Sequence, residues 1–439
     1  MTRSLARRWR TISVVGIGVL SLSAAAACSS STSSTAASSS TASGSTGSSS
    51  SGGASVLGTP KQATGSPITI GFVSGGVGNG IDNSTETPAA EAATAYANAY
   101  LGGIDGHVID LKTCIFNQTP AGATACGNQM VADKVSAVLY GTMGQAPQLE
   151  AAVDPAKIPI VGWEEVDGGM VSGGTAGTHF VITNLIGEIL GAPAKLAQQQ
   201  GIKKSALVVI NVPAAVAGAQ QLGTAFFKTA GVGLDIVAVS PGTADMTPQM
   251  QTALSAGVKS FGLIGDVAFC TSALKAIRTL GFTGLVSSQS TCLGVGTQTA
   301  KGVPGGMAGV DLITAETTQP TAPQVQLYNA VMAKYSPSTQ LVDVTGGSYG
   351  VVLAAVRALN ASAPKTLDAA GVTAALKSAP PEQLPLSATG VTFQCDGKSV
   401  SIAPGVCASG LLAGSYNAAG DITTFTPFDP ASVMKIPPA

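Results

Sequence analysis

The spacing of apolar and polar positions alternates between two patterns along the chain from Pro67 onward. Short runs of apolar and β-branched residues alternate with longer alanine-rich stretches of helical periodicity, which predicts parallel strands covered by helices. The first series contains expected strands at 68–74, 108–115, 137–140 and 158–162, and expected helices at 86–101, 121–135 and 145–152.

A second series of the same kind follows residues 178–183, which we interpret as an extended crossover. Two series of similar length predict an α/β protein with two lobes, each an open, mostly parallel sheet flanked by helices. The second series contains expected strands at 205–210, 234–239, 260–264 and 285–287, and expected helices at 186–200, 216–230, 247–256 and 272–280.

The last third of the chain mixes both patterns. Residues 306–314 are expected to form a strand, and 322–335 and 349–360 to form helices. Two extended runs near the end, 386–395 and 410–422, predict a terminal antiparallel pair.

The N-terminus has the organisation of an export signal. Four arginines precede an apolar run from Ile12 to Leu22, and small residues lead from there to Cys28. The run is shorter than the ~20 residues that span a bilayer and predicts a secretory signal peptide over residues 1–27. Small residues that end in a cysteine before a Ser/Thr tract resemble the lipobox of bacterial lipoproteins, in which the cysteine carries a diacylglyceryl group. An ordinary cleaved signal with an incidental Cys28 is the alternative.

Residues 28–66 are almost entirely Ser, Thr, Gly and Ala, which predicts a disordered tether behind the lipid anchor. The whole sequence has 22 Lys+Arg against 23 Asp+Glu in 439 residues, and this balance argues against a nucleic-acid partner. No second long apolar run follows the signal. We therefore expect a body held to the cell membrane only through Cys28, on the extracytoplasmic face, which is the extracellular side in a Gram-positive-type envelope.

Six cysteines remain beyond Cys28, and an even number in an exported protein predicts disulfides. Metal binding is the alternative, but the Cys-x-x-Cys or Cys/His clusters typical of zinc sites are absent from the sequence, so we expect no metal and no other cofactor. Pairing sequence neighbours joins Cys114 to Cys126, Cys270 to Cys292, and Cys395 to Cys407.

Several segments resemble the type I periplasmic binding proteins of branched-chain amino-acid ABC transporters (the leucine-binding-protein-like family). They are NAYLGGIDG at 98–106, AVLYGT at 137–142, KIPIV at 157–161, AIRTLGF at 276–282 and GSYGV at 347–351. Their order and spacing extend the resemblance over about residues 67–430.

The resemblance implies two lobes joined by a hinge of three crossovers. Lobe one would comprise 67–183 and 314–383, and lobe two 184–313 and 384–430. It also implies a monomer that closes around a small-molecule ligand and delivers it to ABC permease subunits, without catalysis.

By the same resemblance, the loops after the strands hold the ligand. Thr142 matches the family's hydroxyl position for a ligand carboxylate, and nearby backbone N–H groups would suit an anion; capping of the helix that begins near Gln145 is the alternative role. Trp163 is expected to stack on the ligand, with packing as the alternative, and Glu164 or Glu165 could receive a cationic group. The lobe-one candidates are Ser74, Gly141, Thr142, Met143, Trp163 and Glu164.

Lobe two is expected to contribute Asn211, Asp266 and Gln289, and here the sequence departs from the family. Amino-acid binders have an aromatic residue after the first strand of this lobe and an acid near the fourth, whereas this chain has Ala214-Ala215 and Gln289. A neutral amide leaves a buried ammonium group without its charge partner, which is costly. We therefore expect a small polar or partly apolar solute, related to an amino acid or amide, and assign no particular amino acid.

Two other functions remain open. A sensor or receptor lipoprotein of the same fold would have the same sequence features and signal through a partner. An extracellular hydrolase is disfavoured: GGSYG at 346–350 matches the Gly-x-Ser-x-Gly pattern, but both histidines, His107 and His179, precede Ser348, whereas such enzymes need a histidine after it.

Overall fold

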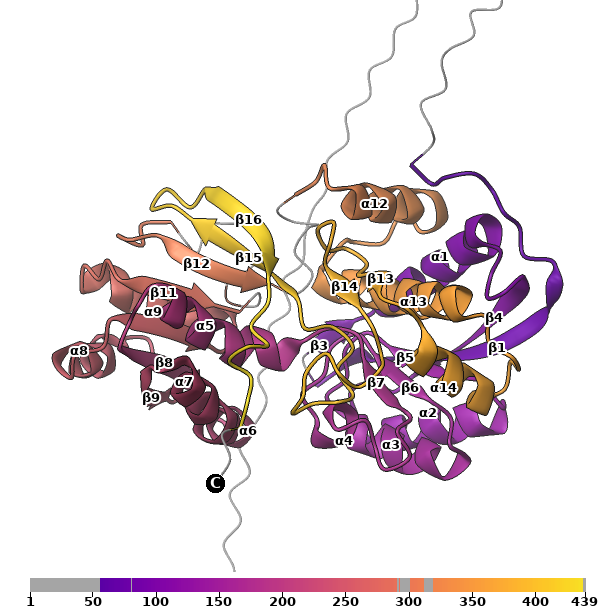
Figure 1. The fold of residues 1–439 in the computed structure, drawn as a ribbon, viewed down its shortest axis with the longest axis horizontal. Coiled ribbons are helices and arrows are strands. Elements are labelled where there is room, and N and C mark those ends of the chain that lie inside the picture. The colour runs from indigo at the N-terminus through magenta and orange to yellow at the C-terminus, as the bar shows by residue number, and fades with distance from the viewer. Residues whose placement is uncertain (1–55, 80, 290–291, 293–300, 312–318, 437–439) are drawn as a thin grey trace, which may run out of the picture. The chain divides into compact units, whose positions relative to one another are not determined.

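The computed structural model describes residues 56–79, 81–289, 292, 301–311 and 319–436. The expected signal peptide, Cys28 and most of the expected tether lie outside the described residues. Within them, two separate main sheets with flanking helices form two lobes (Figure 1). None of the described helices is both long and apolar enough to cross a membrane.

Lobe one contains a five-stranded parallel sheet in the order β4-β1-β5-β6-β7. Residues 178–183, expected as a crossover, supply its last strand, because β7 pairs in parallel with β6. The other strands lie where the apolar runs predicted them. The strands are β1 (Gly65–Ser74), β4 (His107–Ile115), β5 (Val138–Tyr140), β6 (Ile160–Gly162) and β7 (His179–Val181).

Helices cover both faces of this sheet because successive strand residues point to opposite faces. Gly71 faces Met130 on one side, whereas Ile70 on the other side lies near Val352 and Val356. One face carries α2 (Pro120–Ala132) and α3 (Ala146–Val153), and the other carries α1 (Glu86–Tyr96), η1 (Ala97–Leu101), α13 (Asp343–Ser362) and α14 (Ala369–Ser378).

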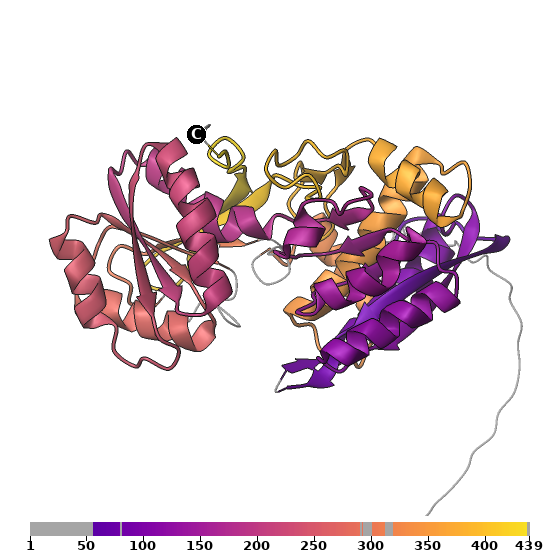
Figure 2. The same ribbon diagram turned by 90° about the horizontal axis from the view of Figure 1, so that it is seen from below.

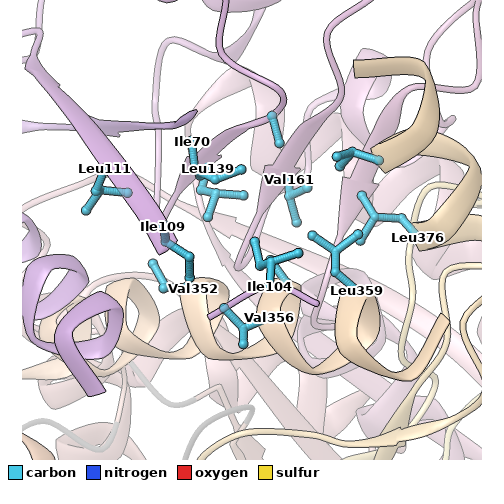
Figure 3. A pocket seen from close by; sticks show the side chains of 13 residues that line it. Ile70, Ile104, Ile109, Leu111, Leu139, Val161, Val352, Val356, Leu359 and Leu376 are labelled. Atoms are coloured by element: carbon cyan, nitrogen blue, oxygen red, sulfur yellow. The ribbon is translucent and has the colours of Figure 1, made fainter. Parts of the chain in front are cut away.

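The core between the sheet and α13 is closely packed. Apolar side chains from the strands, from α13 and from α14 converge there and leave a void of only about 10 Å³ (Figure 3). The labelled residues around it include Ile70, Leu139 and Val161 from the sheet, Val352, Val356 and Leu359 from α13, and Leu376 from α14.

Lobe two contains a seven-stranded sheet in the order β16-β15-β12-β11-β10-β8-β9. The five strands from β12 to β9 run parallel, and β15 and β16 extend the β12 edge in antiparallel pairing. The strands are β8 (Lys204–Ile210), β9 (Gly233–Val239), β10 (Ser260–Ile264), β11 (Leu285–Ser288), β12 (Met307–Asp311), β15 (Leu411–Tyr416) and β16 (Ile422–Phe428).

Both faces of this sheet are also covered (Figure 2). Leu207 and Val209 of β8 belong to one buried cluster, together with residues of α5 and α7, whereas Ala206 and Val208 belong to another with α8 and α9. The helices are η3 (Gly187–Gly191), α5 (Ala192–Gln199), α6 (Pro213–Gly218), η4 (Ala219–Gly223) and α7 (Thr224–Ala230), then α8 (Thr247–Ser255) and α9 (Val267–Thr279).

The expected terminal antiparallel pair is wrong in its partners. The run at 410–422 pairs with the residues that follow it, as β15 with β16. The run at 386–395 instead contains β14 (Thr392–Phe393), which pairs with β13 (Glu382–Gln383).

The expected division of the chain between the lobes is also wrong in part. The backbone N–H of Cys407 donates to Val181 O at the end of β7, and that of Gly405 donates to Val171 O in α4 (Gly168–Val171). Residues up to about 408 therefore pack on lobe one, although those from 384 were expected in lobe two. Only the chain from β15 onward joins the sheet of lobe two.

The tether ends earlier than expected. Ala63 is buried, and its backbone N–H donates to Asn98 O, while that of Lys61 donates to Ala99 O. Residues 61–66, expected in the tether, therefore belong to the folded body.

The three expected disulfide pairings are confirmed. The Cα atoms are 5.6 Å apart in Cys114–Cys126, 5.2 Å in Cys270–Cys292 and 4.3 Å in Cys395–Cys407. The first bond joins β4 to α2, the second joins α9 to the residue that follows β11 by four positions, and the third closes a loop packed on lobe one.

The remaining elements are short or peripheral. A hairpin of β2 (Gly76–Gly78) and β3 (Ile81–Asn83) follows β1, η2 (Asp154–Ala156) extends α3, and α12 (Pro323–Tyr335) packs on α1.

Candidate ligand-binding site

The loops after β1, β5 and β6 form one edge of the sheet in lobe one. Because β5 pairs in parallel with both β1 and β6, the carboxyl ends of the three strands lie side by side. All six lobe-one candidates lie at these ends, namely Ser74, Gly141, Thr142, Met143, Trp163 and Glu164.

Ser74 ends β1 and is 1% exposed. Its hydroxyl donates to Glu86 Oε2 at 3.0 Å, and the backbone N–H of Gly75 donates to the same oxygen at 2.6 Å. Asn83 Nδ2 lies 3.4 Å from Glu86 Oε1, and an ideal Cβ on Gly141 would lie at the same distance from this oxygen, which places the carboxyl group beside the loop after β5. The carboxyl group of Glu86 therefore accepts hydrogen bonds from several donors at this edge.

Glu86 is 0% exposed and is a residue that the sequence analysis missed. Burial raises the pKa of Glu86 to about 7, although the hydrogen bonds from Gly75, Ser74 and Asn83 favour the charged form and oppose this shift. The sequence offered no distinguishing signal, because an acid in the first turn of a helix is common and stabilises it even when exposed.

Thr142 is half-buried, and the helix after it begins only at Ala146, with Gln145 at the cap position. The alternative role of Thr142 as the helix cap is therefore wrong. Gly141 approaches α13 so closely that a Cβ there would lie 2.5 Å from Ser348 Oγ. Met143 is 4% exposed and belongs to the core of lobe one.

Trp163 fills the packing role that was the alternative to stacking on a ligand. It is 1% exposed, and its ring lies on the glycine face of α13, where a Cβ on Gly347 or Gly350 would approach it to 2.9 or 2.6 Å. Its Nε1–H is buried without an acceptor among the described residues. Stacking on a ligand stays a prediction, which requires the ring to become accessible.

Two acids follow Trp163. Glu164 is half-buried, and its backbone N–H donates to Gly141 O, which ties the β6 loop to the β5 loop. Glu165 is 8% exposed and accepts hydrogen bonds from the Tyr140 hydroxyl at 3.4 Å and from the backbone N–H groups of Val166 and Asp167. Burial raises the pKa of Glu165 to about 7.

The lobe-two candidates also lie at the carboxyl ends of neighbouring strands, since β10 pairs with both β8 and β11. Asn211 follows β8 and is exposed. Asp266 is exposed after β10 and caps α9, because its side chain accepts the backbone N–H of Phe269 at 2.8 Å. Gln289 follows β11, and its Nε2 donates to Gly265 O at 3.0 Å.

A disulfide supports this second edge. Cys270 lies in the first turn of α9, and Cys292 lies three residues after Gln289. The bond between them holds the β10 loop to the β11 loop, in parallel with the hydrogen bond from Gln289 to Gly265.

A surface cavity of about 350 Å³ lies elsewhere in lobe one. It is lined by residues near the C-terminal ends of α1 and α13, including Tyr96, Arg357 and Asn360. Glu86 begins α1, so this cavity lies at the opposite end of that helix from the candidate site.

The family model of the periplasmic binding proteins matches residues 67–401. The chain belongs to the periplasmic binding protein family. Because this is a family of binding proteins, the chain is a binding protein and not an enzyme. No curated protein sequence matches this periplasmic binding protein.

Solved structures show that the type I fold is shared. An ABC transporter substrate-binding protein from Sphaerobacter thermophilus is 16% identical with a TM-score of 0.65, over 83% of this chain and 100% of that one. One from Desulfitobacterium hafniense in complex with leucine is 13% identical with a TM-score of 0.63, over 82% and 100%. A fatty-acid ABC transporter substrate-binding protein from Thermomonospora curvata is 14% identical with a TM-score of 0.60, over 86% and 97%.

The Gly-x-Ser-x-Gly pattern has a structural explanation in this periplasmic binding protein. Residues 346–350 lie within α13, which begins at Asp343, and not on a strand-to-helix turn. Gly347 and Gly350 allow α13 to approach Trp163 closely, and Gly141 allows the β5 loop to approach Ser348 of α13.

Proposed function

We propose that this periplasmic binding protein is a lipid-anchored substrate-binding subunit on the extracytoplasmic face, which captures a small solute between its lobes and delivers it to an ABC importer. The observation that carries the proposal is the family match over residues 67–401, on a fold of two open α/β sheets. Open sheets of this kind bind ligands at the carboxyl ends of their strands.

The candidate site supports a small polar solute. Hydroxyl, amide and carboxyl groups lie at the strand ends of both lobes, including Ser74, Glu86, Asp266 and Gln289. The structural relatives named with leucine and with a fatty acid indicate that this fold accommodates chemically different solutes. The side chains at the strand ends, and not the fold, must therefore select the ligand.

Thermal unfolding of the full chain in detergent tests the proposal. Amino acids, their amides, organic amines and fatty acids are added singly, and a bound solute at 100 times its Kd should stabilise the folded state by about 2.7 kcal/mol. The solute recovered afterwards should be chemically intact. Chemical conversion of a stabilising solute, or the absence of stabilisation by every class, would contradict the proposal.

The lipid anchor is tested separately. Mass spectrometry of the N-terminal peptide should show a diacylglyceryl group on Cys28, and Cys28→Ala should release the protein from the membrane. An unmodified Cys28 in the membrane-bound protein would contradict the anchor without affecting solute binding.

A further inference from the structure

The carboxyl group of Glu86 takes the hydrogen-bond donors at the end of β1. The Ser74 hydroxyl and the Gly75 backbone N–H both donate to its Oε2, at 3.0 and 2.6 Å. Asn83 Nδ2 reaches Oε1 at 3.4 Å, and an ideal Cβ on Gly141 would also lie 3.4 Å from Oε1, so the carboxyl group lies beside the loop after β5. Three donors and no described acceptor surround this group, which is the environment of an anion-binding site.

These donors lie where a ligand anion was expected. Ser74 ends β1 and Thr142 follows β5, and these two strands are neighbours in the sheet. The N–H groups around Thr142 were expected to bind a ligand carboxylate, but the carboxyl group of Glu86 already lies beside this loop, next to Gly141. A second carboxylate at this edge would have to share donors with Glu86. Above about pH 7, where Glu86 is mostly ionised, it would also lie beside a like charge, which is unfavourable in a poorly solvated site.

The other acids of this edge increase the negative charge. Glu165 follows β6 with 8% exposure, and neither Glu86 nor Glu165 forms an ion pair with a lysine, arginine or histidine in the described part of the chain. Glu164 lies between Trp163 and Glu165 in the same loop. Above about pH 7, where Glu86 and Glu165 are mostly ionised, a cation near the strand ends would therefore gain electrostatic energy, and an anion would lose it.

We propose that Glu86 occupies the anion position of lobe one, so that the site rejects a solute carboxylate at the ends of β1 and β5 and selects organic amines that lack one. The inference rests on the proposed solute-binding function and specifies its ligand class. Glu86 is 0% exposed and acts by occupying the donors and, once ionised, by its charge, not by direct contact with the solute.

Matched solute pairs test the selectivity. The affinity of the full chain in detergent is measured by titration calorimetry for leucine against 3-methylbutylamine, phenylalanine against phenethylamine, and lysine against cadaverine. In at least one pair the amine should bind at least about tenfold more tightly than its amino acid. An amino acid that binds more tightly than its amine would overturn the inference and leave the proposed function standing. Binding of none of the probes would overturn both.

Removal of Glu86 provides a second test. In Glu86→Ala the three donors lose their acceptor, so acetate should raise the melting temperature of the variant, whereas chloride at equal concentration should not. Acetate should leave the wild type and Glu91→Ala unchanged, because Glu91 is an exposed acid of the same helix. Equal responses of Glu86→Ala and Glu91→Ala to acetate would overturn the inference.

The conservative variant covers the case in which Glu86→Ala does not fold. Glu86→Gln keeps the side-chain volume and removes the charge, and it should narrow the preference for the amine over the amino acid by about tenfold. An unchanged preference in a folded Glu86→Gln protein would overturn the inference.

Discussion

Two glycines set the distance between α13 and the ring of Trp163. A Cβ on Gly350 would lie 2.6 Å from Cζ3 and 2.7 Å from Cη2 of the indole. The ring is 1% exposed and surrounded by the core of lobe one, so it has little room to move away. A helix-interior glycine, which normally weakens a helix, is here required for packing.

We expect Gly350→Ala to lower the free energy of unfolding by about 1–3 kcal/mol, because overpacking outweighs the gain in helix propensity. Urea unfolding followed by the fluorescence of Trp163 measures the change. Gly218→Ala in α6 is the matched control, since a Cβ there meets no atom within 4 Å and should leave stability unchanged or raise it by up to about 1 kcal/mol. A loss of the same size in both variants would contradict the packing explanation.

Buried acids make stability depend on pH in a defined direction. The pKa of Glu165 is raised by burial from 4.5 to about 7, so the unfolded chain releases this proton at lower pH than the folded protein does. The stabilisation is fully present below pH 4.5 and is lost as the pH rises through about 7. Glu86 acts in the same direction.

Glu165→Gln should reduce this pH dependence. The amide keeps an oxygen for the N–H groups of Val166 and Asp167, and it does not ionise. Between pH 5 and pH 8 the variant should lose about 2 kcal/mol less unfolding free energy than the wild type. Urea unfolding at both pH values measures this difference. Glu91→Gln, on an exposed position, should follow the wild type, and a parallel pH profile for Glu165→Gln would refute the assignment.

At the scale of single residues, the sequence predicted that the candidate residues follow strands, but not the interactions that they make there. Ser74, Thr142 and Trp163 could be placed at strand ends because buried strands are recognisable as short apolar runs. The hydrogen bond between Ser74 and Glu86 joins residues that are 12 positions apart and separated by a hairpin, so no local sequence pattern predicts it. The burial of Trp163 likewise depends on Gly347 and Gly350, almost 190 positions further along the chain.

Secondary-structure elements followed the sequence where periodicity was strong. All strands of the two parallel series except β7, which was expected as a crossover, were predicted, because parallel strands are apolar on both faces. Helix α13 begins at Asp343, six residues before the expected start at 349. The start was expected too late because Gly346 and Gly347 lie in the first turns of the helix and glycine has a low helix propensity. Tertiary packing outweighs their low helix propensity.

The bond between Cys114 and Cys126 fixes α2 to the edge strand β4. The double variant Cys114→Ala/Cys126→Ala should lower the free energy of unfolding by about 3 kcal/mol, because the unfolded chain regains the entropy of an open loop. Cys395→Ala/Cys407→Ala is the matched comparison, since its loop also closes over 12 residues and the same loss is expected. Urea unfolding without reductant measures both. If either double variant kept the wild-type stability, the chain-entropy explanation would be wrong for that bond.

At the scale of the whole molecule, the two lobes could be predicted from two repeats of the strand and helix pattern, and the family match supports that architecture. The lobe to which the C-terminal segment belongs could not be predicted. Residues 384–408 follow strands and helices of lobe one and precede β15 of lobe two, so their sequence neighbours do not determine which lobe they join. Backbone hydrogen bonds to Val171 and Val181 decide it.

These same bonds have a mechanical consequence. The chain leaves lobe one after Val181 and again after Cys407, and the two departing segments are joined by the Cys407 N–H to Val181 O bond and by Asn184 Nδ2 to Ser409 O at 3.2 Å. The two segments therefore leave lobe one as a bonded pair, so neither can be displaced along the other without breaking these hydrogen bonds.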